Sequence, residues 1–238
     1  SLLQISQINP DNRVFSVMLL WLSIQQKDFE FALVQAKSLD KRFGDNGMQV
    51  FNLAHLALSN GDYNTSAAAF QYILDKGPAN PYYLESLTGN LKSRFLGITS
   101  GLTSGIEEYR NLEIEYIRTL DQFGYNSRTI FLMRDLAHLQ AFYLEDMDAA
   151  VELLDKAIAI PGVNPNVVAE CKLELGDILL YRGEVWDASL LYSQVDKALK
   201  NDPLGSEAKF RNAKLSYYIG EFDWARAQLD VLKAATSK

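Results

Sequence analysis

The amino-acid sequence predicts an all-α fold, a single solenoid of about six helical hairpins stacked in line over residues 1–238. Three observations lead to this prediction. A ten-residue phrase recurs along the chain, small residues repeat at fixed places in the recurring units, and prolines fall between the units. The phrase is plainest in GEVWDASLLY at 183–192 and returns as GEFDWARAQL at 220–229.

Three more copies of the phrase are KDFEFALVQA at 27–36, GDYNTSAAAF at 61–70 and EDMDAAVELL at 145–154. The third residue of each copy is apolar or aromatic, and we call these residues the anchors: Phe29, Tyr63, Met147, Val185 and Phe222. Three residues after each anchor lies a small side chain: Ala32, Ser66, Ala150, Ala188 and Ala225. Most anchors are 34 to 38 residues apart, and the gap of 84 after Tyr63 leaves room for one longer unit.

Each unit is predicted to be a helix, a tight turn and a second helix that starts near the anchor. A Gly or Asp before the anchor suits an unusual backbone angle or a helix cap. Small residues in the first helix let the two helices approach closely, as at Ala54, Gly176 and Ala213. Large residues seven after the anchor are expected to fill the gap to the next unit: Phe70, Leu154, Tyr192 and Leu229. Prolines end one helix and start the next: Pro81, Pro161, Pro165 and Pro203.

The segment at about 81–124 is predicted to be a longer, atypical hairpin. Its second helix has apolar residues at three- and four-residue spacing: Ile106, Tyr109, Leu112, Tyr116 and Leu120. Between its helices, GITSGLTSG at 97–105 is expected to be a flexible linker. It is no phosphate-binding loop, because no Gly-Lys-Ser/Thr follows it, and Thr replaces the central Ser of a nucleophile elbow.

The segment LELGDILLYRGEVWDASLLYSQVDKAL at 173–199 resembles a tetratricopeptide (TPR) repeat. The matching residues are Leu175, Gly176, Gly183, Ala188 and Tyr192. The chain departs from the family at Lys172, where Trp is common, and at His138, where Gly or Ala is preferred. The resemblance is good in four units, weaker in the first and poor over 81–124. It implies a right-handed superhelix with a concave groove. The chain is also similar to large multi-repeat TPR proteins of bacterial cell envelopes, which implies an envelope or periplasmic location.

Composition excludes several classes of function. The net charge of −7, without a basic run longer than Lys41-Arg42, disfavours nucleic-acid binding. No apolar run reaches the roughly 18 residues of a membrane span, so no membrane insertion is expected. One Cys and two His leave too few ligands for a metal site, and no cofactor motif is present. A partner of protein or peptide nature is therefore expected.

No set of residues predicts catalysis. Asp135 and His138 lie three apart on one helix and could orient each other, but no Ser or Cys completes a triad. His138 is better interpreted as a satisfied core or boundary residue. Cys171 near a helix start is better interpreted as buried and inert than as activated. The pairs Glu107-Glu108 and Glu113-Glu115 predict a solvated face.

The TPR resemblance also implies which residues line the groove. In three consecutive units the thirteenth position is Tyr143, Tyr181 and Tyr218, and Tyr217 precedes the last of them. Tyrosine offers a broad apolar face with a hydroxyl and is common at binding surfaces. The alternative is that these tyrosines brace adjacent hairpins. Further candidate groove residues are Asp177, Lys214, Arg211, Phe210, His55 and Trp21.

The sequence therefore favours a non-catalytic scaffold or adaptor that binds an extended or helical partner segment. The Lys, Arg and Asn set with which some TPR grooves bind a C-terminal carboxylate is absent, which favours a more hydrophobic ligand. The alternative is a glycan or small-molecule module on the same groove, with aromatic faces flanked by carboxylates. Because no polar helix covers the last hairpin, either the chain is a fragment or that hairpin mediates self-association.

Overall fold

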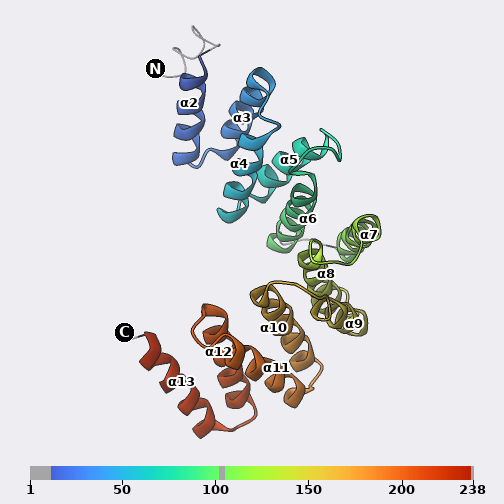
Figure 1. Cartoon of the computed structure of the whole chain (residues 1–238), viewed down its shortest axis with the longest axis vertical. Helices are drawn as coiled ribbons and strands as arrows, with labels where there is room; N and C mark the ends of the chain where they lie inside the picture. The colour runs from blue at the N-terminus through green and yellow to red at the C-terminus, as the bar shows by residue number, and fades with distance from the viewer. Residues whose placement is uncertain (1–11, 102–104, 237–238) are drawn as a thin grey trace. The chain divides into compact units, whose positions relative to one another are not determined.

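The computed structural model describes residues 12–101 and 105–236, and this part of the chain is all α-helical, as the sequence predicts (Figure 1). It divides into two compact units, residues 1–108 and 109–238. The first unit holds α2 (Arg13–Gln25), α3 (Phe29–Phe43), α4 (Met48–Ser59), α5 (Tyr63–Leu74) and α6 (Tyr83–Ser100). α7 (Ile106–Phe123) begins at the boundary. The second unit continues with α8 (Ile130–Tyr143), α9 (Met147–Ile158), α10 (Pro165–Tyr181), α11 (Val185–Ala198), α12 (Pro203–Tyr218) and α13 (Phe222–Thr236).

Every anchor is the first residue of a second helix, as expected. α3, α5, α9, α11 and α13 begin at Phe29, Tyr63, Met147, Val185 and Phe222. The small residue three positions later is buried in each case, from fully buried Ala32 to 3% exposed Ala225. Without a long side chain there, the second helix can lie close to the first.

The turn before each anchor has one backbone geometry. The residue two positions before the anchor has a positive φ in all five units: Lys27, Gly61, Glu145, Gly183 and Gly220. Only glycine adopts this left-handed angle without steric cost, which explains its prevalence there. In three units the following Asp caps the second helix by accepting a hydrogen bond from a backbone N–H three residues on: Asp28, Asp62 and Asp146.

Pro165 and Pro203 are the first residues of α10 and α12, where the missing N–H of proline costs nothing. These helices have 17 and 16 residues, against 12 in α4 and in α5. The longer spacing in the second half of the sequence is thus taken up by longer helices.

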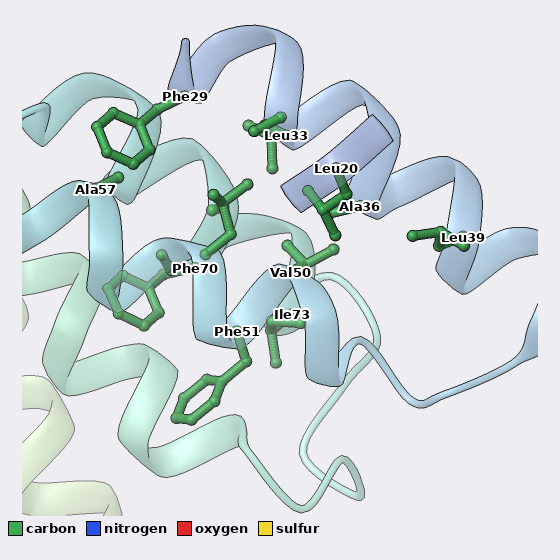
Figure 2. Packing of buried hydrophobic residues seen from close by; sticks show 14 residues of the cluster. Leu20, Phe29, Leu33, Ala36, Leu39, Val50, Phe51, Ala57, Phe70 and Ile73 are labelled. Carbon is green, nitrogen blue, oxygen red and sulfur yellow. The ribbon is translucent and has the colours of Figure 1, made fainter. Parts of the chain in front are cut away.

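The core of the first unit lies between α3, α4 and α5. Figure 2 shows Phe29, Leu33, Val50, Phe70 and Ile73 packed together. Phe70, seven residues after its anchor, is fully buried, as are Leu154 and, to 1% exposure, Tyr192. The corresponding Leu229 of α13 is 43% exposed, so the expected burial fails at this position.

A buried carboxylate joins three helices of the same unit. The side chain of Asp40, 1% exposed, accepts hydrogen bonds from the backbone N–H of Gly47 at 2.7 Å and from the hydroxyl of Tyr72 at 2.6 Å. It also forms an ion pair with Lys76 at 2.5 Å. Asp40 thereby ties the end of α3 to the start of α4 and the end of α5.

In the segment predicted to be an atypical hairpin, the linker between the two helices differs from the prediction. Gly97 to Ser100 continue α6, so the prediction of a flexible linker is wrong for these residues. Residues 102–104 of the predicted linker lie outside the described residues. In α7, the predicted apolar spacing buries Leu112, Tyr116 and Leu120.

Candidate functional site

The candidate site is a surface built from the first helices of three consecutive hairpins in the second unit, α8, α10 and α12. Each helix carries a stripe of functional side chains three or four residues apart, and such spacing places them on one helical face. We call these stripes together the first-helix surface: Arg134, His138 and Phe142 of α8; Glu170, Glu174, Asp177 and Tyr181 of α10; Glu207, Arg211, Lys214 and Tyr218 of α12.

Contacts between neighbouring stripes place α8 beside α10. Arg134 forms an ion pair with Glu170, and the His138 Nδ1 lies 2.7 Å from the Glu174 Oε1. Further along the same two helices, the rings of Phe142 and Tyr181 are 5.7 Å apart. The three contacts follow the helices in register, as expected for parallel helices of adjacent repeats.

Asp177 makes the corresponding link from α10 to α12. It forms an ion pair with Arg211 and accepts a hydrogen bond of 2.7 Å from the hydroxyl of Tyr192. Burial raises the pKa of Asp177, the charge of Glu174 raises it further, and the bonds from Tyr192 and Arg211 oppose this shift. Arg211 in turn donates to Glu207 at 2.8 Å and to the carbonyl of Leu173 at 3.3 Å.

The three tyrosines of the predicted ladder have different environments. Tyr181 is 63% exposed and Tyr218 is 72% exposed. Tyr143 is half-buried, and its ring lies 5.0 Å from that of Tyr109. Burial raises the pKa of Tyr143, and Tyr109 adds to the shift. The rings of Tyr181 and Tyr218 are therefore exposed to solvent, whereas the ring of Tyr143 packs against Tyr109 of α7.

Tyr217 and Phe210 are the other candidate aromatic residues on α12. Tyr217 is 60% exposed and contacts both Tyr218 and Phe222, with ring centroids 6.1 and 5.4 Å apart. Phe210 is 44% exposed, and the ammonium of Lys214 lies 5.8 Å from its ring centroid. Exposed aromatic rings thus extend the first-helix surface along α12.

The two remaining candidates belong to the first unit. Trp21 of α2 is 60% exposed. The ring of His55 on α4 packs edge-on against Phe51 and Phe70, at 4.7 and 5.1 Å. Burial lowers the pKa of His55, as does the charge of Lys92, while Glu85 opposes them. His55 is thus exposed to solvent while its ring also contacts the core residues Phe51 and Phe70 of its own hairpin.

Several members of the first-helix surface were not expected from the sequence. Asp135, which the sequence leaves as a possible partner of His138, lies 3.1 Å from Arg134. The actual partners, Glu170 and Glu174, lie 36 residues beyond Arg134 and His138. The sequence signal for these pairs is a cationic or titratable residue and a carboxylate separated by one repeat. Spacing within a single helix does not reveal such a pair.

Three further features of the described residues bear on function: the Cys171 thiol, possible metal ligands and possible membrane spans. Cys171 is buried, and burial raises the pKa of its thiol to about 11. No cluster of three or more His, Cys, Asp or Glu side chains suited to a metal ion occurs within 12–101 and 105–236. None of the helices in those ranges has the length and apolar character of a membrane span.

A pocket of about 370 Å³ lies in the first unit, lined by side chains of α5 and α6 and by Glu108. Tyr63, Asn64, Ser93 and Arg94 are among its walls. None of the candidate groove residues lines it.

Solved structures with the same fold are TPR proteins. TTC0263, a thermophilic TPR protein of Thermus thermophilus, matches with a TM-score of 0.59 and 16% identity over 84% of this chain and 96% of its own. BtubC (BKLC) from P. vanneervenii matches with a TM-score of 0.67 and 16% identity over 92% and 91%. MamA matches with a TM-score of 0.52 and 18% identity over 82% and 94%. No protein-family model and no curated protein sequence matches the chain.

These structures show that the chain has the all-α repeat fold of the TPR solenoids, as the sequence resemblance implied. The described residues therefore form a TPR-like repeat fold.

Proposed function

We propose that this chain is a non-catalytic scaffold or adaptor and that its first-helix surface binds an extended or helical segment of a partner protein. The observation that carries the proposal is the exposure of Tyr181 and Tyr218, 63% and 72%, on neighbouring first helices. Exposed aromatic rings on neighbouring helices are common at recognition surfaces, and tyrosine is enriched among residues that dominate binding energy.

The hydrogen bonds and ion pairs of the neighbouring carboxylates on α10 support the same function. Asp177 is bonded to Arg211 and Tyr192, and Glu174 to His138, so both carboxylates are held in place by interactions within the protein. Side chains held in this way need not reorganise when a partner binds, which lowers the entropic cost of association.

The proposal is tested by using the chain as bait in a lysate of its source cell. We expect specific partners to be retained by the wild-type chain and lost by the Tyr181→Ala/Tyr218→Ala double variant. Trp186→Ala on α11 is the matched control, because Trp186 is 72% exposed but lies outside the first-helix surface. Circular dichroism establishes that each variant is folded. A double variant that is folded and retains every partner would contradict the proposal.

Glycan or small-molecule binding on the same surface is the alternative. The first-helix surface offers aromatic faces beside carboxylates, at Tyr181 and Asp177, but the pocket of about 370 Å³ does not include them. A thermal-shift screen with oligosaccharides distinguishes the two functions. A rise in melting temperature that Tyr181→Ala abolishes would favour the glycan.

A further inference from the structure

The charge of the first-helix surface is unevenly distributed. The stripe of α10 contributes Glu170, Glu174 and Asp177 and no cation. Glu207 on α12 and Asp135 on α8 add two more carboxylates beside them. The permanent cations of the surface are Arg134, Arg211 and Lys214, so the carboxylates are in excess.

Two of these cations each bind two carboxylates of the protein. Arg134 is bonded to both Asp135 and Glu170, and Arg211 to both Asp177 and Glu207. One guanidinium neutralises one unit of negative charge, so each set of one arginine and two carboxylates keeps a net negative charge. The partner of Glu174 is His138, which is not a permanent cation as arginine is.

Glu174 and Asp177 lie three residues apart on the same face of α10 and repel each other. The charge of Glu174 contributes to the raised pKa of Asp177. Their side chains are 19% and 36% exposed, so both are partly open to solvent. A cation placed between them would relieve this repulsion.

An aromatic ring lies next to these carboxylates. Tyr181 follows Asp177 by one turn of α10, and its ring is exposed. A Lys or Arg side chain that reaches Asp177 can lay its charge or its methylenes on this ring, an arrangement that cation–π attraction stabilises. Tyr218 offers a second exposed ring on the adjacent helix.

We infer that the partner segment taken by the first-helix surface is basic, with a Lys or Arg side chain seated between Glu174 and Asp177 and an apolar side chain on Tyr181 or Tyr218. This inference rests on the proposed function and specifies the chemistry of the partner. An acidic segment would bring like charge to the α10 stripe, which opposes binding. The net charge of −7 of the whole chain acts in the same direction over longer distances.

The test uses a random 16-residue peptide library displayed on phage and panned against the full chain. We expect enriched peptides to carry more Lys and Arg than the unselected library, and to be lost when panning uses Tyr181→Ala/Tyr218→Ala. A peptide synthesised from the enriched set should bind Glu174→Gln about five-fold more weakly than wild type. Raising the salt concentration should reduce this difference.

Glu152→Gln is the matched control, because Glu152 on α9 is an exposed carboxylate paired with Lys156 and lies outside the first-helix surface. The same peptide should bind this variant within about two-fold of wild type. Equal weakening by the two substitutions would overturn the inference, because it would reflect overall charge alone.

The outcomes separate the inference from the proposed function. Neutral or acidic peptides that still require Tyr181 and Tyr218 would overturn the inference and leave the proposed function standing. Enriched peptides that do not require these tyrosines, or no enrichment at all, would count against both.

Discussion

The ring of Tyr192 fills the space beside Gly176 that a side chain on residue 176 would need. A Cβ added to Gly176 would lie 2.5 Å from the Cε1 of Tyr192, well inside van der Waals contact. The hydroxyl of the same tyrosine donates to Asp177, 2.7 Å away on the first-helix surface. Tyr192 therefore connects the close packing of α10 on α11 to the charged stripe of α10.

We predict that Gly176→Ala lowers the free energy of unfolding by about 1–3 kcal/mol relative to Gly97→Ala, the usual cost of overpacking a tight core. Helix propensity alone would change stability by about 1 kcal/mol in the opposite direction. Urea denaturation followed by circular dichroism measures the difference. Gly97→Ala in α6 is the control, since its Cβ would meet only the Tyr63 Cβ at 3.6 Å. Equal stability of the two variants would contradict the packing argument.

Asp40 should make the stability of the protein depend on pH in the acid range. Burial raises its pKa, but the bonds from Lys76, Tyr72 and Gly47 outweigh burial and lower the pKa to about 2. Because the folded pKa is below the unfolded one, the stabilisation is present above about pH 4 and is lost as pH falls toward 2. It amounts to about 2 kcal/mol.

This dependence is measured as the difference in unfolding free energy between wild type and Asp40→Asn from pH 6 to pH 2. The difference should shrink as the pH falls. Burial and the neighbouring Asp40 raise the pKa of Asp45, so the wild type alone does not isolate the contribution of Asp40 and the comparison with the variant is needed. A difference that is constant with pH would show that the Asp40 charge contributes nothing to stability.

Arg211→Met should destabilise the second unit by about 1 kcal/mol, since it leaves the partly exposed Asp177 and Glu207 without their cation. The pKa of Asp177, already raised by burial, should rise further, which NMR titration of the carboxyl carbon detects. Arg226→Met on exposed α13 should change stability by less than about 0.5 kcal/mol. An unchanged Asp177 pKa in Arg211→Met would refute the proposed ion pair.

The thiol of Cys171 should be unreactive in the folded protein. It is 1% exposed, and burial raises its pKa to about 11, so both access and the thiolate form are suppressed at neutral pH. With an aromatic disulfide reagent at pH 8, we expect labelling at least about 100-fold slower than in urea-unfolded protein. Comparable rates in the two states would mean that α10 opens readily.

Much of the fold follows from the sequence alone. The five anchors and the small residues after them are features of single hairpins, separated by at most a few turns of chain, so local periodicity and turn chemistry determine them. The same reasoning located the starts of α10 and α12 at Pro165 and Pro203. It also predicted correctly that Cys171 is buried.

Only the tertiary structure decided which charged and aromatic side chains meet. The sequence allows His138 and Asp135 to orient each other within one helix, but His138 bonds to Glu174, because the register between α8 and α10 brings residues 36 apart together. Tyr143 and Tyr181 hold the same place in their repeats, yet Tyr109 of α7 partly covers Tyr143 while Tyr181 stays exposed. A hairpin's own residues determine its shape, whereas the exposure of a side chain depends on the neighbouring helix.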